Sequence, residues 1–339
     1  MAEANHLYPY VFRPILKSVV WGGQKIRPYK GLEPTDEPIG ESWEISHVDG
    51  SFSVIDNGAL SGKTIDDLLV YHGEELLGRH VFERFGRKFP LLIKFIDARE
   101  DLSVQVHPDD HLAAERHNSF GKTEMWYVLQ AEPNARLYSG LAVQSSPDDY
   151  ERRVTDGTIM DVLAEHQVHA GDVFFLPAGR IHAIGAGCFV AEIQQTSDIT
   201  YRIYDYNRPD AEGRMRELHT EWAKDAINFQ VEKSYQTDYR SCRNTAVELV
   251  DCPYFHTSVL ELDQPLQRNL LEKDSFVIYM CLDGALTITD NRSNTIQLQQ
   301  GRSVLIPAAL ADLQLMPQIA CKLLETYIPP LSNSQHFSL

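Results

Sequence analysis

The chain has 339 residues and a formal net charge of -17, with 43% hydrophobic and 23% charged residues. A chain of this length can bury a large core, and its ordinary composition excludes a fibre and an extensively disordered chain. The negative charge argues against a nucleic-acid surface, because phosphate backbones are bound by clustered lysine and arginine. An anionic substrate would therefore need basic residues gathered locally.

The cysteines and the hydrophobic segments indicate a cytoplasmic protein. Five cysteines are scattered without a CxxC pair, which is typical of reduced thiols in a reducing compartment. The first residues, MAEANHLYPYVFRP, lack the basic region and apolar run of a signal peptide. No apolar segment approaches the roughly 20 residues of a membrane span. We therefore expect no membrane and no nucleic acid among its partners.

The first hundred residues predict short strands followed by helix and then strand. Residues 7–60 read as extended pieces broken by glycine and proline, and apolar residues at three- and four-residue spacing predict a helix over Thr64–Gly86. Phe89–Ala98 is expected to be a strand, with Lys94 set inside its apolar run. Such a lysine either extends its ammonium out of a core or points at an anion.

The stretch Asp101–Asp110, DLSVQVHPDD, has the alternation of a half-buried strand. Its polar face carries Ser103, Gln105 and His107, and Asp109 and Asp110 are typical of a helix start. A glutamine and a histidine two residues apart on a strand project in parallel and could bind one metal ion. For this pair alone, a solvated strand face is the better interpretation.

The next elements are predicted in the order helix, strand, helix, sheet and helix. Asp110–His117 is expected to be helical, and Gly121–Leu129 is expected to be a strand with Lys122, Glu124 and Trp126 on one face. Ser145–Glu165 and Leu218–Phe229 are predicted helices, and His169–Asp210 is predicted to return to sheet. Pro329–Leu339 is expected to be a loose tail.

An internal repeat relates two parts of the chain. GDVFFLPAGRIHA at Gly171–Ala183 aligns with GRSVLIPAALADL at Gly301–Leu313, at a constant offset of 130 residues. The second copy has Asp312 where the first has His182, and it offers no Gln-x-His pair. The repeat therefore predicts two copies of an antiparallel β-module. The strand-turn-strand with Glu124 and the Gly171-x(5)-Pro177-x(4)-His182 segment resemble the cupin fold, which implies a mainly β protein of two cupin-like antiparallel β-barrel (jelly-roll) modules with short helical segments. Residues 1–240 would form the catalytic module with helical insertions, and residues 241–339 a degenerate module without metal ligands.

Four residues form a candidate metal site, and each lies in a segment with strand periodicity: Gln105, His107, Glu124 and His182. Two imidazoles, one carboxylate and one amide oxygen suit a divalent ion such as zinc. Strands of one barrel can point all four side chains inward. A single histidine among 13 is more often structural, so the prediction depends on the conjunction of the four.

Four motifs, QVHPDD, GKTEMWYVL, GDVFFLPAGRIHAI and SDITYRIYDYNR, resemble type I phosphomannose isomerase (mannose-6-phosphate isomerase) in its short bacterial form. The resemblance runs from about Tyr8 to Arg208, and more loosely through the remaining chain. It implies one zinc ion per chain, bound by the four candidate ligands, and a sugar phosphate as substrate. It also implies an arginine near the reacting carbons, Arg202, and residues lining the site at Ser103, Lys122, Glu192 and Asp198.

Interconverting an aldose and a ketose through a cis-enediol requires a base and stabilisation of negative charge. Zinc can act as the Lewis acid, and a fixed guanidinium at Arg202 can add electrostatic stabilisation. Glu192 is the first candidate for the base and Lys122 the second. The preferred role for Lys122 is binding the 6-phosphate together with Ser103 and Lys94, while Asp198 is expected to contact the substrate.

Other interpretations remain open at this point. Lys122 could merely pair with Glu124, and Arg202 could brace Asp198 or Asp205. The protein could be another cupin enzyme, such as an iron or manganese dioxygenase or an epimerase, because two histidines and a carboxylate also suit ferrous iron. It could also be a non-catalytic sugar-binding cupin. We expect a monomer or a homodimer.

Overall fold

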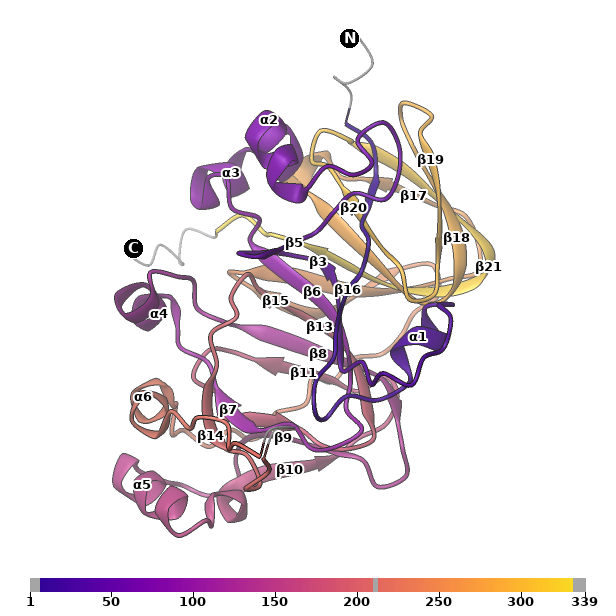
Figure 1. The fold of residues 1–339 in the computed structure, drawn as a ribbon. Helices are drawn as coiled ribbons and strands as arrows, with labels where there is room; N and C mark the ends of the chain where they lie inside the picture. The colour runs from indigo at the N-terminus through magenta and orange to yellow at the C-terminus, as the bar shows by residue number, and fades with distance from the viewer. Residues whose placement is uncertain (1–6, 210–212, 332–339) are drawn as a thin grey trace.

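The computed structural model describes residues 7–209 and 213–331 and is built mainly from β-sheet, with short helices on its outside (Figure 1). A six-stranded sheet forms the centre. Its strands are, in spatial order, β11 (Val173–Leu176), β8 (Glu124–Ala131), β13 (Cys188–Gln195), β6 (Leu91–Asp97), β3 (Glu41–Ile45) and β2 (Ile15–Lys17). All the pairings are antiparallel.

A second, five-stranded sheet lies beside the first, toward the lower end of the molecule in Figure 1. Its strands are, in order, β10 (Leu163–Gln167), β9 (Arg136–Leu141), β12 (His182–Ile184), β7 (Val104–Val106) and β14 (Tyr201–Tyr204). In β7 the alternation expected from the sequence is confirmed, because Val104 and Val106 are fully buried while Gln105 between them is partly exposed.

The carboxy-terminal part of the chain forms a third sheet, coloured orange to yellow in Figure 1. Its main path is β1 (Tyr10–Val11), β20 (Ser303–Ile306), β18 (Val277–Asp290), β21 (Asp312–Tyr327), β16 (Phe255–Leu262) and β15 (Ala246–Cys252). Two further strands join its sides, β17 (Leu266–Asn269) on β21 and β19 (Thr295–Gln299) on β18, while β4 (His47–Val48) and β5 (Ser51–Phe52) form a separate ribbon.

The helices are short: α1 (Ile26–Tyr29), α2 (Ile65–Leu77), α3 (Arg79–Phe85), α4 (Asp110–His117), α5 (Pro147–Thr155) and α6 (Thr220–Ala226), with 3-10 turns at Ile159–Val162 and Leu271–Lys273. The boundaries predicted for α4 are confirmed, and Asp109 caps it by accepting a hydrogen bond from the Leu112 N–H at 2.8 Å. No helix in the described ranges is long and apolar enough to span a membrane.

Two predicted helices are shorter than expected. The predicted helix Thr64–Gly86 is divided at Gly78, whose φ is +90° and whose missing Cβ leaves room for the Asp274 carbonyl oxygen. The predicted helix over Ser145–Glu165 ends at Thr155, because Gly157 adopts a φ of +68° and turns the chain toward β10.

The prediction of closed barrels is wrong for the described residues. The central sheet ends at β11 and β2, and the five-stranded sheet ends at β10 and β14. After β14 the chain leaves the sheet because Tyr206 and Asn207 adopt left-handed φ angles of +56° and +50°. The mainly β character is confirmed, but as open, facing sheets.

The two halves of the chain share packing. One hydrophobic cluster contains Phe95 and Ile193 from the central sheet together with Ile278 and Leu324 from the carboxy-terminal sheet. Strand β1, near the amino terminus, pairs with β20. The carboxy-terminal sheet therefore supports the central one from behind, which helps to hold the strands that carry the candidate site.

Candidate active site and metal centre

Three predicted metal ligands converge between the two facing sheets. The Nε2 atom of His107 lies 3.4 Å from one carboxylate oxygen of Glu124, and the Nε2 atom of His182 lies 3.3 Å from the other. All three side chains are buried, and their candidate donor atoms lie within 4.8 Å of one another. This is the spacing expected of ligands around a single ion.

The register of the strands produces this convergence. His182, the first residue of β12, lies directly opposite Gln105 of β7, and His107 follows the end of β7. Glu124 comes from the other side, as the first residue of β8 in the central sheet. Residues from three separate stretches of sequence therefore meet at one point between the sheets.

Backbone carbonyls fix the orientation of both imidazoles. The Nδ1 atom of His107 donates to the carbonyl of Ile199 at 2.9 Å, and that of His182 donates to the carbonyl of Arg180 at 2.8 Å. With the proton on Nδ1, each Nε2 carries a lone pair. Burial lowers the pKa of both histidines, that of His182 to about 4, so the neutral form is favoured.

The atoms that meet here fit a cation. His107 Nε2 and both Glu124 oxygens are buried without a hydrogen-bond partner, although they face one another. Several lone pairs converging in a buried space are unfavourable unless a positive ion lies between them. The Gln105 amide, whose nitrogen is 3.3 Å from His182 Nε2, can present its oxygen to the same point after rotation of the amide group.

A cavity of ≈ 360 Å³ adjoins these ligands. It is lined by seven of the predicted site residues, Lys94, Ser103, Gln105, Lys122, Glu192, Asp198 and Arg202. Gln105 belongs both to this wall and to the ligand cluster, so the two features form one site. The structure therefore brings together all ten residues predicted from the sequence.

Two buried ion pairs organise the cavity floor. Lys94 Nζ of β6 lies 3.2 Å from Glu192 of β13 and 3.5 Å from Glu41 of β3. Trp126 donates its indole N–H to Glu192 at 2.9 Å, and Trp43 donates to Glu41 at 2.5 Å. One lysine thus joins two carboxylates, each of which also accepts an indole hydrogen bond.

These contacts decide the charge of Glu192. Burial alone would raise its pKa, but the positive charges of Lys94 and Lys122 and the Trp126 hydrogen bond outweigh burial and lower the pKa. The two carboxylates in turn raise the pKa of Lys94 despite its burial. Glu192 is therefore favoured as an ionised carboxylate in the cavity wall, which is the state required of a base.

Glu124 has the opposite environment. Burial and the nearby charge of Glu192 raise its pKa to about 8, while the ammonium of Lys122, 3.5 Å away, acts in the other direction. The pairing of Lys122 with Glu124 that was considered from the sequence is thus present. A second positive charge at the ligand cluster would favour the anionic form of Glu124.

Arg202 and Asp198 lie toward the open side of the cavity. Arg202 of β14 lies opposite Gln105 in the sheet and is half-buried, with Nη1 donating to the Glu217 carbonyl at 2.9 Å. Asp198, in the turn after β13, is exposed. No ion pair joins Arg202 to Asp198 or Asp205 within the described parts of the chain, whereas Asp205 pairs with Arg208 and Arg216.

Some lining residues were missed by the sequence analysis: Glu41, Trp21, Thr200 and Arg216. Glu41 is separated from Lys94 by more than fifty residues, and only the pairing of β3 with β6 brings them together. The alternation of Glu41 with Trp43 on one strand face is the signal that could have indicated a polar, aromatic wall.

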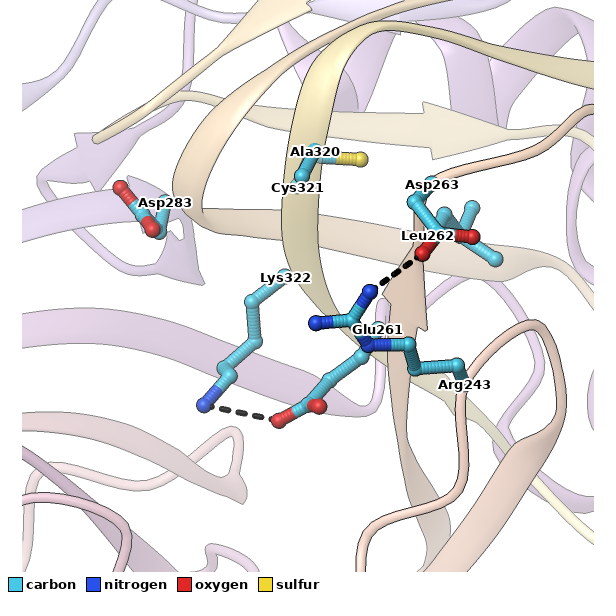
Figure 2. A pocket seen from close by; sticks show the side chains of 8 residues that line it. All are labelled: Arg243, Glu261, Leu262, Asp263, Asp283, Ala320, Cys321 and Lys322. Carbon is cyan, nitrogen blue, oxygen red and sulfur yellow. Dashed lines mark hydrogen bonds and ion pairs between the residues drawn. The ribbon is translucent and has the colours of Figure 1, made fainter.

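A second hollow, of ≈ 210 Å³, lies in the carboxy-terminal part and contains none of the predicted site residues (Figure 2). Four of its five charged side chains pair with one another, and the fifth is Asp283. Arg243 lies 2.6 Å from Asp263, and Lys322 lies 2.9 Å from Glu261. It has no converging, unpaired donor atoms of the kind seen at the ligand cluster, so it is a weaker candidate for a catalytic site.

Two family models match the chain: "Phosphomannose isomerase type I, catalytic domain" over residues 11–136, and "Mannose-6-phosphate isomerase, cupin domain" over residues 245–324. Mannose-6-phosphate isomerase ManA of Bacillus subtilis is 31% identical over 317 residues, which are 92% of this chain and 97% of the relative. The probable mannose-6-phosphate isomerase GmuF of the same organism is 38% identical over 252 residues, 73% of this chain and 78% of the relative.

A comparison with solved structures agrees with these sequence matches. A crystal structure of the mannose 6-phosphate isomerase from Bacillus subtilis superposes with a TM-score of 0.84 at 30% identity, covering 94% of this chain and 99% of that one. A structure from Archaeoglobus fulgidus, described as that of a "putative mannosephosphate isomerase", shares the fold at 23% identity and a TM-score of 0.76. The isomerase family indicated by the motifs is confirmed: the chain belongs to the type I phosphomannose isomerases.

Proposed function

We propose that this chain interconverts mannose 6-phosphate and fructose 6-phosphate with one zinc ion, held by Gln105, His107, Glu124 and His182. The observation that carries the proposal is the convergence of unpaired, buried ligand atoms beside a cavity that contains an ionised carboxylate. Family membership supports the reaction and its sugar phosphate substrate. Two neutral imidazoles with a carboxylate and an amide oxygen fit zinc.

The bound ion would supply Lewis-acid stabilisation of negative charge on the substrate oxygens. The protein's own residues supply the rest. Glu192 is our candidate for the base that moves a proton between neighbouring carbons, because its carboxylate lines the cavity and is held ionised by Lys94 and Trp126. Its Oε1 faces the Lys94 ammonium at 3.2 Å, and a carboxylate oxygen that accepts one such contact still has a second lone pair with which to accept a proton.

Lys122 is the second candidate for the base, and its preferred role remains binding the phosphate group. Its ammonium lies beside Glu124 and lines the cavity, which places it close to both the ligand cluster and the substrate space. For Arg202 we propose stabilisation of the developing enediolate charge, since its guanidinium adjoins Gln105 at the wall of the cavity.

Ser103 and Asp198 line the same space and are proposed to contact the sugar. Lys94 was predicted to bind substrate as well. Its position between Glu41 and Glu192 supports a further role, in which it fixes the Glu192 carboxylate and keeps it charged. An ammonium that faces two carboxylates has little attraction left for a dianionic phosphate.

We also propose that residues 1–240 and 241–339 are two related modules, of which only the first binds metal. The first and last residues of β20 come 130 residues after those of β11. Each of these strands pairs with an equivalent neighbour: Leu176 of β11 lies opposite Glu124 of β8, and Ile306 of β20 lies opposite Val277 of β18. Val277 thus takes the place of Glu124, as Asp312 takes the place of His182. The second copy lacks the carboxylate and imidazole that would be needed for a second zinc site.

A chelation experiment tests the proposed function. Purified protein treated with EDTA should lose conversion of mannose 6-phosphate to fructose 6-phosphate, and added zinc should restore it. Protein that carries iron, consumes oxygen and gains nothing from zinc would instead support a dioxygenase. The cavity argues against that alternative, because an oxygen-activating site has no need of Lys122 and Arg202 beside its ligands.

A further inference from the structure

Two guanidinium groups face the same side of the cavity. Arg202 extends from β14, and Arg216 comes from the segment that precedes α6. The charge of Arg216 contributes to lowering the pKa of Arg202, second only to burial, so the two groups are close enough to repel each other. Neighbouring positive groups on a cavity wall are favourable only if an anion offsets the repulsion.

Arg216 is held rigidly for such an anion. Its Nε donates to Asp205 Oδ2 at 2.6 Å, and its Nη2 bonds to the other oxygen of the same carboxylate. Asp205 is itself 6% exposed and also accepts a hydrogen bond from Arg208. Such a two-point contact fixes the plane of the guanidinium, and its Nη1 has no hydrogen-bond partner among the residues that the structure describes.

Arg202 has no carboxylate within ion-pair distance in the described residues. Its Nη1 donates to a backbone carbonyl, and its Nε is buried without a partner. Of these two arginines, only Arg216 has a carboxylate partner among the described residues, and that carboxylate is shared with Arg208. This end of the cavity therefore has guanidinium hydrogen-bond donors that no described carboxylate occupies, and such donors suit a phosphate dianion.

Each of the two lysines of the cavity has a carboxylate partner, so Lys122, proposed above to bind the phosphate, would share it with a second cation. Lys94 lies between Glu41 and Glu192, and Lys122 lies beside the metal-ligand carboxylate Glu124. Arg202 lies opposite Gln105 of the ligand cluster in the sheet, and Arg216 lines the same cavity close to Arg202. A sugar with its reacting carbons at the ligand cluster could thus extend its far end toward Arg216.

We propose that Arg216, positioned by Asp205, is a specificity-determining residue that binds the phosphate group of the substrate. The inference rests on the proposed function and adds a residue to it. Arg216 would select phosphorylated sugars over their neutral counterparts, while Arg202 continues to act near the reacting carbons. A planar, doubly anchored arginine is better suited to this than a lysine, because it can present its remaining N–H donors in a fixed direction.

Three variants test the assignment: Arg216→Ala, Arg216→Lys and Arg208→Ala. Arg208 shares the Asp205 carboxylate but does not line the cavity, so its removal controls for loosening of the network. Arg216→Ala should raise KM for mannose 6-phosphate roughly 10- to 100-fold, the cost of losing charge-assisted hydrogen bonds, and should lower kcat much less. Arg216→Lys should recover part of the loss, and Arg208→Ala should leave KM within about threefold of the parent.

Inorganic phosphate serves as a probe that needs no turnover. In a calorimetric titration of the metal-loaded protein, phosphate should bind the parent and the Arg208→Ala variant, and it should bind Arg216→Ala at least about tenfold more weakly. Equal phosphate affinity and equal KM in the parent and Arg216→Ala, with both folded by thermal melting, would overturn the inference. So would a loss in Arg208→Ala as large as that in Arg216→Ala.

The two proposals fail in different ways. If metal-loaded parent protein does not isomerise mannose 6-phosphate, the proposed function is wrong, whatever the titration shows. If the parent is active and Arg216→Ala keeps its KM and its phosphate affinity, the function stands and the assignment of Arg216 is wrong.

Discussion

Lys94 and Glu192 face each other across the paired strands β6 and β13, with Nζ 3.2 Å from Oε1 and both side chains buried. A buried carboxylate without such a partner would take up a proton, because burial disfavours the charged form. The ion pair and the Trp126 hydrogen bond prevent this, so the cavity holds a negative charge next to the metal-ligand cluster. The proposed chemistry depends on that arrangement.

Replacing Glu192 with glutamine should keep the shape of the side chain and remove its ability to accept a proton. We expect kcat to fall at least about 100-fold, the usual contribution of a positioned base, while the metal content stays the same. Steady-state kinetics and metal analysis of the same sample test this. Glu41→Gln is the matched control, because Glu41 contacts the same lysine and also accepts an indole hydrogen bond. An equal loss of kcat in both variants would show that the charge of the network matters and that Glu192 is no base.

Removing His182 should empty the metal site. Its Nε2 faces Glu124, and its Nδ1 is fixed on the Arg180 carbonyl, so no neighbouring donor replaces it. His182→Ala is expected to lower zinc affinity by about 10- to 100-fold or more and to abolish most of the activity. Equilibrium dialysis against zinc followed by metal analysis provides the measurement. Full zinc binding and full activity in this variant would disprove the ligand set.

Arg202→Ala should separate catalysis from metal binding. Arg202 is not one of the proposed ligands, and its Nη1 donates to the Glu217 carbonyl, so the zinc content should be unchanged. Turnover should fall by roughly 100- to 1000-fold, mainly in kcat, as expected when one electrostatic contact to the transition state is lost. If only KM changes, Arg202 binds the substrate and does not stabilise the transition state.

In the metal-free protein, the two buried histidines should cost stability as the pH falls from 6.5 toward 4. Burial lowers the folded-state pKa of His182 to about 4, and also lowers that of His107, from the ordinary value of 6.5. Between these values the histidines of the unfolded chain bind protons that those of the folded chain do not, which lowers the free energy of unfolding by at most about 1.4 kcal/mol per pH unit for each histidine. Glu124 acts in the opposite direction, because burial raises its folded-state pKa to about 8. Urea unfolding in EDTA at pH 7 and pH 5 should therefore compare the parent with His182→Gln, which keeps the Glu124 contribution and lacks that of His182. Between pH 7 and pH 5 the parent should gain less stability, or lose more, than the variant. An equal change in both proteins would contradict the assignment.

Local pattern predicted much of this structure. The alternation around Gln105 and the limits of α4 agree with the structure. Each depends only on neighbouring residues and can be read without knowing which strands pair.

Features that depend on strand pairing were not predictable in the same way. The contact of Glu41 with Lys94 requires β3 to lie beside β6, and the position of Arg216 requires the chain after β14 to fold back on Asp205. The expected barrels failed for a related reason. Alternation indicates which side chains face inward, but whether a sheet closes depends on the pairing of its edge strands, and β14 is an edge strand after which the chain turns away at Tyr206 and Asn207.

The most direct test of the account is the isomerase assay performed on purified protein whose metal content has been measured in the same sample. Formation of fructose 6-phosphate from mannose 6-phosphate would be followed while zinc is titrated into metal-free protein. The account predicts that the rate rises with bound zinc and levels off at about one ion per chain. Protein that carries one zinc ion per chain and yet produces no fructose 6-phosphate would contradict it.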